Sequence, residues 1–155
     1  MDPEKLQRRV NFSYNEYEWT EEQQKVFNKF ISERYANYKN PENTLRSYLD
    51  LLNQLVLKIK KPFSEITYDD LIPVLAEWQK SYSKATIHGR KCKLKAFFRW
   101  ESGDKNDPRV EKVRSGGYVS PVTIHDLLTD EEITELRKAA KADPRDLAMI
   151  DFHLL

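Results

Sequence analysis

The sequence predicts an all-α fold, with a four-helix bundle followed by a linker and two further helices. Apolar residues recur at helical spacing along most of the chain, capping residues stand where these stretches begin, and breaker-rich segments separate them. The chain has 155 residues, of which 39% are hydrophobic, enough for one ordinary core and part of another. We therefore expect one complete domain and a piece of a second.

An N-terminal extension, residues 1–19, precedes the predicted bundle. Its sequence is acidic toward the end and shows no clear apolar pattern. Three aromatic residues there have two interpretations, packing onto the bundle or contact with a neighbouring subunit: Tyr14, Tyr17 and Trp19.

The first two helices of the bundle begin at recognisable caps. Thr-Glu-Glu-Gln from Thr20 to Gln23 forms a capping box, and the apolar residues behind it predict a helix over about 21–38. Asn40-Pro41 supplies an N-cap and a first-turn proline, and a leucine-rich stripe behind it predicts a second helix over about 41–58.

The third and fourth helices follow the same logic. Thr67 and the acidic residues after it indicate a helix over about 68–81, although Pro73 inside it favours a kink or a later start. Ser83 caps a fourth helix over about 84–101, which completes a domain spanning 20–102.

Helical periodicity stops after this domain. Clusters of glycine, proline, serine and aspartate over 103–126 predict a linker, because structureless stretches of this length seldom lie inside one compact domain. In the remaining part, 127–155, a second capping box at Thr129 predicts a helix over about 130–142. Asp143-Pro144 begins a last helix whose apolar face has no evident partner, so we expect the chain to be cut short there.

The strongest indication of function is the charge of the fourth predicted helix. Between Ser83 and Glu101 there are six Lys or Arg residues and one acid, whereas the whole chain has a net charge of only +1. Residues 81–120 hold ten basic and four acidic side chains, and no other quarter of the chain has such an excess. Because screening limits each charge to roughly 8 to 10 Å at physiological salt, this local excess favours a polyanion despite the low net charge.

A helical wheel separates this helix into two faces. Apolar residues that we expect to pack in the core gather on one side: Ile87, Leu94, Phe97 and Phe98. Cationic residues line the adjacent side: Lys84, His88, Lys91, Lys95 and Arg99. A merely solvated lysine face is the alternative interpretation, and the uneven charge distribution favours anion binding over it. The aromatic residues Tyr48, Trp78 and Trp100 are expected to fill the core as well.

The order of these motifs resembles a known family. The stretches 43–48, 63–71 and 83–100 are similar to the core-binding domain of tyrosine recombinases, the phage-type and Xer-type integrases, and 127–136 and 143–155 are similar to the start of their catalytic domain. The resemblance implies a four-helix SAM-like bundle whose second and fourth helices lie against the DNA major groove, followed by a truncated catalytic domain. It also implies a role in DNA integration or recombination, with double-stranded DNA and other recombinase subunits as partners.

Helix geometry and the resemblance together give the candidate DNA-binding residues. On the second helix they are Asn43, Arg46, Ser47 and Gln54, and on the fourth Lys84, Thr86, His88, Arg90, Lys91, Lys95 and Arg99. The lysines suit phosphates, whereas Arg46, Ser47, Thr86 and His88 suit base edges, the alternative being ordinary exposed polar residues. Asp50 on the same face is unfavourable near phosphate unless Arg46 pairs with it or it accepts from a cytosine amino group.

We expect DNA binding without DNA cleavage. The recombinase chemistry needs an arginine pair, a lysine, histidines and a tyrosine nucleophile, and none of these is identifiable; in particular, no histidine is followed by arginine three positions on. We expect no metal and no cofactor, because Cys92 is the only cysteine and is expected to have no His or Cys neighbour at ligand spacing; it is interpreted as a partly buried or inert thiol. No apolar stretch approaches membrane-spanning length and no secretory signal is evident, so we expect a cytoplasmic protein.

Two other functions remain open at this stage. One alternative is a stand-alone DNA-binding regulator that occupies recombination or operator sites. The chain also fits a helical protein-interaction module whose basic face meets an acidic partner, in which case it should not bind duplex DNA even at low salt.

Overall fold

The computed structural model describes residues 3–117, 128–141 and 143–154, with the side chains of the last helix described as far as Ile150. Within these ranges every regular element is a helix, which confirms the predicted all-α class. The chain divides into two units, residues 1–118 and 119–155. None of the helices described is long and apolar enough to cross a membrane.

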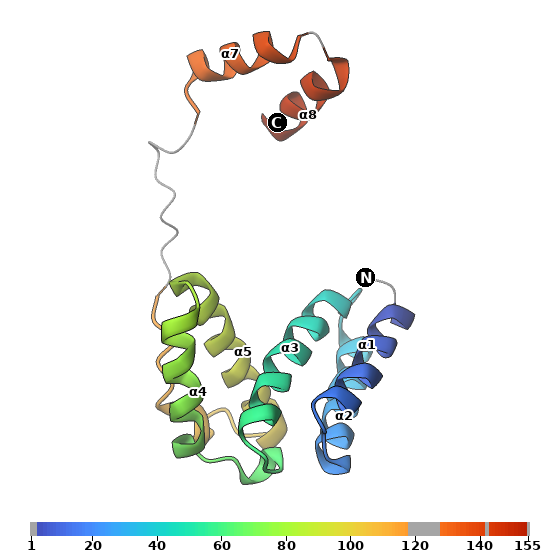
Figure 1. Ribbon diagram of the computed structural model, residues 1–155, viewed down its shortest axis with the longest axis vertical. Helices are drawn as coiled ribbons and strands as arrows, with labels where there is room; N and C mark the ends of the chain where they lie inside the picture. Colours follow the sequence, from blue (N-terminus) through green and yellow to red (C-terminus); the bar gives the residue numbers. More distant parts are fainter. Residues whose placement is uncertain (1–2, 118–127, 142, 155) are drawn as a thin grey trace. The chain divides into compact units, whose positions relative to one another are not determined.

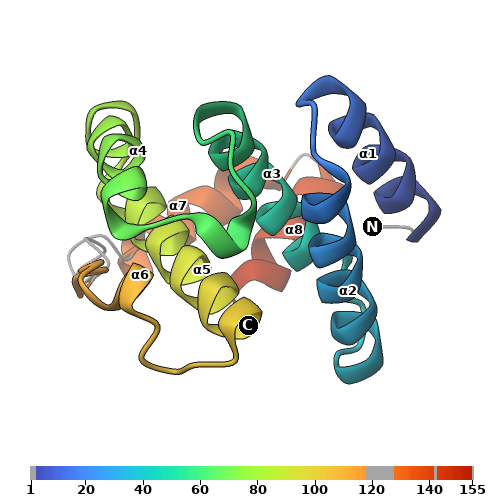
Figure 2. The same ribbon diagram turned by 90° about the horizontal axis from the view of Figure 1, so that it is seen from below.

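The first unit places its helices in two layers. Figure 2 shows α4, α3 and α1 side by side in one layer, with α5 and α2 in the other, and Figure 1 shows α3 between α4 and α1. In chain order the elements are α1 (Pro3–Glu16), α2 (Glu21–Asn37), α3 (Glu42–Lys58), the 3₁₀ turn η1 (Phe63–Glu65), α4 (Tyr68–Ser81), α5 (Lys84–Ser102) and α6 (Pro108–Glu111).

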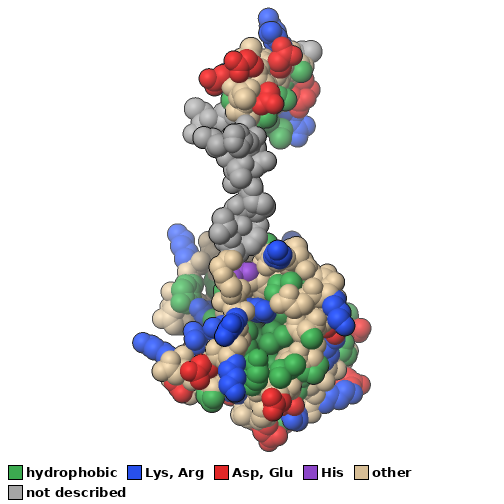
Figure 3. Space-filling model, turned by 90° about the vertical axis from the view of Figure 1, so that its left-hand side faces the viewer, with side chains coloured by type: hydrophobic (Ala, Val, Ile, Leu, Met, Phe, Trp, Pro, Cys, Tyr) green, Lys and Arg blue, Asp and Glu red, His purple; other side chains and the backbone are tan. Residues whose placement is uncertain are grey.

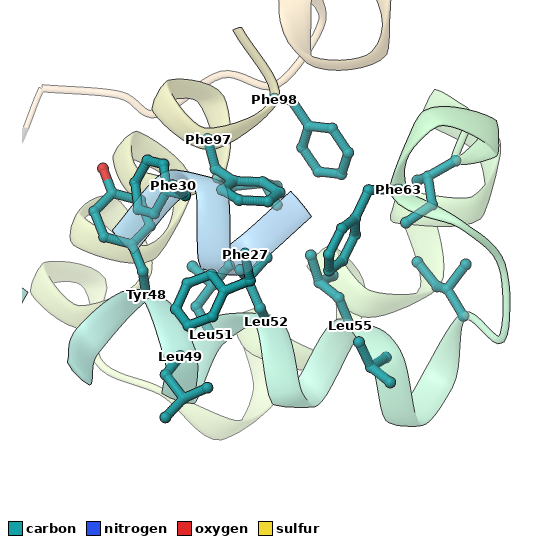
Figure 4. Close-up of a cluster of buried hydrophobic side chains, with 14 of the residues drawn as sticks. Phe27, Phe30, Tyr48, Leu49, Leu51, Leu52, Leu55, Phe63, Phe97 and Phe98 are labelled. Carbon is teal, nitrogen blue, oxygen red and sulfur yellow. The ribbon is translucent and has the colours of Figure 1, made fainter. Parts of the chain in front are cut away.

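Aromatic rings and the leucines of α3 form the core of this unit, as Figure 4 shows. Phe97 of α5 lies at its centre, with ring centroids 5.4 Å from Phe30 and 5.2 Å from Phe63 in edge-to-face arrangements. Of the aromatic residues predicted for the core, all are buried except Trp100, which is partly buried and packs against it. The apolar side of α5 is therefore anchored as its sequence predicts.

Most helix starts agree with the predicted caps. The side chains of Thr20, Thr67 and Ser83 each accept a hydrogen bond from a backbone N–H in the first turn. Asn40 is not the N-cap of α3, however. It adopts a left-handed conformation with φ 52°, and Pro41 takes the cap position without a side-chain bond.

Helix α4 begins where its cap predicts and runs through Pro73. Of the two expected effects of Pro73, a kink or a later start, the later start was wrong, because a capping box between Thr67 and Asp70 fixes the first turn. Pro73 is exposed on this helix, so the carbonyl group that its missing N–H leaves unbonded lies where water can reach it.

Sequence analysis found no helix in residues 1–19, yet α1 occupies most of that segment. Its buried residues, Leu6, Val10, Ser13 and Tyr14, share one face that packs on α3. Trp19 is 4% exposed, and its indole N–H donates to Asn53 Oδ1 at 2.9 Å. Asn53 in turn donates to Ser13 Oγ at 3.1 Å. Of the two interpretations of these aromatic residues, the structure shows Tyr14 and Trp19 packed in the bundle.

The first part of the segment that the sequence assigned to a linker packs on α5. It contains α6, and Val110 and Val113 are buried in the core. Arg109 fixes this segment: its guanidinium bonds Asp107 and Glu101 at 2.6 and 2.7 Å and donates to the carbonyl of Phe63 at 2.9 Å. The rest of the predicted linker, from residue 118, lies outside the described residues.

The second unit contains α7 (Asp130–Ala140) and α8 (Pro144–Leu154). The predicted capping box at Thr129 is present, and α7 ends two residues before the predicted position. No residue of α7 is buried, and Leu128, Leu136 and Met149 are exposed.

Candidate nucleic-acid interface

Helix α5 orients the candidate residues because its core side is fixed. Ile87, Leu94, Phe97 and Phe98 are all buried, so the cationic side predicted from the wheel faces outward along one flank. We refer to this row as the basic stripe: Lys84, His88, Lys91, Lys95 and Arg99. Lys84 and Arg99, at the two ends, are exposed, whereas the three central residues are half-buried.

The half-burial of the stripe comes from three residues that follow α6, Val113 to Ser115, which we call the strap. Lys95 Nζ donates to the carbonyl oxygen of Val113 at 3.0 Å, and Lys91 Nζ donates to that of Arg114 at 3.1 Å. His88 Nδ1 lies 3.0 Å from the carbonyl oxygen of Ser115. Because the partners run in opposite order, the strap lies antiparallel to α5.

These contacts hold the stripe without neutralising it. A carbonyl group carries no net charge, and an ammonium group that donates one proton to it keeps two more for another acceptor. Of the ion pairs between residues that the structure describes, none includes the four Lys and Arg residues of the stripe, Lys84, Lys91, Lys95 and Arg99. The positive charge of this flank is therefore available to an external anion.

A contrast is provided by the lysines at the end of α3. Lys58 pairs with Glu77, and Lys61 Nζ lies 2.8 Å from Asp70 Oδ1, in a depression between α3 and α4. Hydrogen bonds from Lys61 and Thr67 lower the pKa of Asp70 to about 2. These two lysines are already matched by carboxylates of the first unit.

The crest of α5, beside the stripe, carries only small residues: Ala85, Cys92 and Ala96, which are exposed, and Gly89, which is half-buried. A Cβ atom added to Gly89 would meet no atom within 4 Å. Cys92 is exposed, so its expected partial burial was wrong: position 92 lies on the crest rather than toward the core. Its sulfur lies 3.6 Å from Nε2 of His88, one turn earlier, so the expectation that Cys92 has no histidine neighbour at ligand spacing was wrong.

Two predicted site residues are engaged inside the molecule. Gln54 Oε1 accepts hydrogen bonds from Arg90 at 2.7 Å and Trp78 at 3.1 Å, and its amide group donates to the Tyr82 hydroxyl at 3.0 Å. The Arg90 guanidinium also stacks 4.1 Å from the Tyr82 ring centroid. At about 100° per residue, Arg90 lies about 140° around the helix from Lys95, and so faces α3 and α4 rather than the stripe.

The remaining candidates on α3 lie near its first turns. Asn43 is exposed, and Ser47 donates its hydroxyl to the Asn43 carbonyl at 3.1 Å. Arg46 Nε lies 3.9 Å from Asp50 Oδ2, which is one of the two arrangements that the sequence analysis gave for Asp50. A second arginine, which that analysis did not consider, is closer: Arg9 of α1 lies 3.0 Å from Asp50 Oδ1. The helical spacing of Leu6 and Val10 was the signal that could have placed it.

Thr86, the last candidate on α5, is exposed in the first turn. Its backbone N–H donates to the Ser83 hydroxyl at 3.3 Å, and the two hydroxyl groups lie 3.0 Å apart. Thr86 therefore both belongs to the cap and presents a hydroxyl group to solvent.

No protein-family model, no curated protein and no solved structure matches this chain. What the surface can bind therefore follows from its own geometry and charge.

Figure 3 shows the face of the first unit on the side of α4 and α5. Lys and Arg side chains lie around an apolar area there, and Asp and Glu lie mostly toward the lower and outer edges. Cations whose charge is not matched by a neighbouring carboxylate attract a polyanion at ranges of roughly 8 to 10 Å. This arrangement is suited to binding the phosphates of a nucleic acid.

Proposed function

We propose that the first unit binds double-stranded DNA in the manner of the core-binding domain of a tyrosine recombinase, with α3 and α5 against the major groove. The observation that carries this proposal is the basic stripe of α5, which is anchored from behind by buried phenylalanines and whose Lys and Arg residues form no ion pair with a described carboxylate. The order of sequence motifs that resembles the recombinase family supports the same assignment, including a SAM-like bundle.

The shape of α5 supports an approach to the groove. The major groove of B-DNA is about 12 Å wide and admits one α-helix. Small side chains along the crest, from Ala85 to Ala96, let the helix backbone come close to the bases. The cations on its flank then lie at the height of the phosphates, which fix register and orientation.

The candidate residues divide by role. Lys84 and Arg99 contact phosphates at the two ends of α5, and Lys91 and Lys95 contact them with the protons that the strap leaves unused. Thr86 is placed at the start of α5 for a base edge. Gln54 and Arg90 contribute by holding α3, α4 and α5 together.

We propose that this chain binds DNA in integration or recombination without cutting it. None of its positions matches the recombinase arginine pair, the His-x-x-Arg motif or the tyrosine nucleophile. Incubation with supercoiled plasmid should therefore give neither nicked DNA nor a covalent protein–DNA adduct. Either product would contradict this part of the proposal.

Duplex binding can be tested by fluorescence anisotropy between about 50 and 200 mM salt, where each phosphate contact contributes about 0.9 to the slope of log K against log salt. The test variant is Lys84→Gln with Arg99→Gln. The matched control is Lys25→Gln with Lys60→Gln, which removes the same charge from exposed positions outside α5. We expect the test variant to bind duplex DNA more weakly, and its salt slope to be lower by about 0.9 for each lost phosphate contact. The control should keep the salt slope of the parent protein and lose only a little affinity.

Two results would overturn the proposal. One is an affinity for duplex DNA that does not depend on salt. The other is an equal loss in the test and control variants, which would mean that only total charge matters. Absence of duplex binding at low salt, together with binding of an acidic polypeptide, would instead support the protein-interaction module.

A further inference from the structure

Asp50 of α3 lies between two arginines that come from different helices. Arg9 of α1 approaches one carboxylate oxygen at 3.0 Å and Arg46 of α3 approaches the other at 3.9 Å. All three side chains remain well exposed, at 44% for Arg9, 47% for Arg46 and 42% for Asp50. One carboxylate thus holds two guanidinium groups at the surface, and the group of three keeps a net positive charge.

This cluster is not needed to hold α1 in place. Exposed ion pairs contribute at most about 1 kcal/mol. The helix is already fixed on α3 by its buried residues, including Leu6 and Val10, and by the buried hydrogen bond between Asn53 and Ser13. Stability therefore gives no sufficient reason for Arg9 to face Asp50.

The cluster has the chemistry of a phosphate contact. Each guanidinium has five N–H donors in a fixed plane, and the pairing with Asp50 occupies only part of them. The hydrogen bond to Asp50 limits the rotation of the Arg9 side chain, and the ion pair at 3.9 Å keeps Arg46 beside the same carboxylate, so less conformational freedom is lost when an anion binds. Arg46 also lies on the α3 face that carries the predicted DNA-binding residues.

We propose that Arg9 and Arg46, oriented by Asp50, bind a DNA phosphate, and that α1 is therefore part of the DNA-binding surface. This inference rests on the proposed function, since it takes duplex DNA as the ligand. Asp50 is a positioning residue in it. The sequence analysis found the Asp50 carboxylate unfavourable near phosphate; in this proposal the carboxylate directs two arginines toward the DNA.

The sign of one substitution separates positioning from simple charge. Asp50→Asn keeps the shape of the side chain and raises the net charge of the protein by one. If Asp50 only repels DNA, this variant binds more tightly. If Asp50 orients the two arginines, the Asp50→Asn variant binds DNA several-fold more weakly despite the added positive charge. We expect the weaker binding.

Neighbouring arginines on α1 supply a matched pair. Arg9→Gln removes the proposed contact, whereas Arg8→Gln removes a cation that is 81% exposed and pairs with Glu4 on α1 itself. By anisotropy with the same duplex, we expect Arg9→Gln to weaken binding about tenfold at constant salt, the effect of one charge-assisted hydrogen bond, and to reduce the salt slope by about 0.9. Arg8→Gln should stay within about twofold of the parent protein, a change too small to count as a lost contact.

The outcomes distinguish this inference from the proposed function. Equal effects of Arg9→Gln and Arg8→Gln, or tighter binding by Asp50→Asn, would overturn the inference while the dependence on Lys84 and Arg99 stands. Loss of that dependence as well would overturn the proposed function. Circular dichroism of each variant should show unchanged helicity and melting, because all three positions are exposed.

Discussion

Replacing Arg109 with methionine tests how the segment after α5 is held. The Arg109 side chain is 13% exposed, as is that of Glu101, and the Asp107 side chain is 1% exposed. Its guanidinium donates to both carboxylates and to the carbonyl of Phe63, and it stacks 4.8 Å from the Phe98 ring centroid. Arg109→Met keeps much of the volume but leaves two poorly solvated carboxylates without their cation.

Breaking a buried ion pair by removing one partner costs about 3 to 5 kcal/mol. We expect the lower end, about 3 kcal/mol, because Asp107 Oδ1 still accepts from the backbone N–H of residue 109, which lies 2.9 Å away. That loss is a large share of the roughly 5 to 15 kcal/mol that stabilises an ordinary domain. The free energy of unfolding can be measured with urea, following tryptophan fluorescence from Trp19 and Trp78 in the core.

Arg8→Met is the control: the ion pair that Arg8 forms with Glu4 is exposed, so its loss should change stability by less than about 1 kcal/mol. If Arg109→Met costs no more than this control, the cluster does not hold the segment and the reasoning fails.

The same variant should change the acid stability of the protein. Burial raises the pKa of Asp107, but hydrogen bonds from Arg109 and Ser102 outweigh it, so its pKa lies below the ordinary value of 3.8. A folded-state pKa below the unfolded one adds stability that is complete above about pH 5 and is lost as pH falls through the folded pKa. Without the Arg109 side chain the pKa of Asp107 is lowered less, because only the bonds from Ser102 and the backbone N–H of residue 109 remain, so the variant should lose less stability than the parent protein on acidification from about pH 5.

Two further predictions follow from the backbone and from Asp70. Gly89→Ala should stabilise the first unit by about 0.5 to 1 kcal/mol, because the added methyl group meets no atom within 4 Å in a helix interior. Gly103→Ala should destabilise it by about 1 kcal/mol, because Gly103 caps α5 with φ +71°. Equal changes in the free energy of unfolding by urea would contradict both predictions. NMR titration of the Asp70 carboxyl group should give a pKa of about 2, which should rise toward 3.8 in Lys61→Met. Because the pKa is lower in the folded state, this group stabilises the fold fully above its unfolded-state pKa, and the effect is lost as pH falls toward 2. A pKa near 4 in the parent protein would refute the assignment.

The sequence predicts the helices well where local chemistry decides them. The caps at Thr20, Thr67, Ser83 and Thr129 place four helix starts at the residues where they occur. Capping and periodicity did not reveal α1. Most of its residues are charged or polar, so the helical spacing of its few buried residues, which begin at Leu6, is easily overlooked.

The candidate site was predictable only in part. The direction of the basic stripe follows from helical periodicity, since the apolar residues of α5 fix the opposite side. The strap could not be predicted, because its bonds to Lys91 and Lys95 use backbone carbonyl groups, which every residue has. The partners of Asp50 and Gln54 come from other helices, Arg9 and Arg90, and depend on how those helices pack.

The antiparallel course of the strap makes its release sequential. The carbonyl of Ser115, on His88, is nearest to the chain that follows, and the carbonyl of Val113, on Lys95, is farthest from it and adjoins the buried core. Tension applied to the chain beyond residue 117 would therefore break the contact of Ser115 with His88 first, then the hydrogen bond to Lys91, and last the one to Lys95. The number of lysine N–H donors free to bind an anion would thus increase stepwise with that tension.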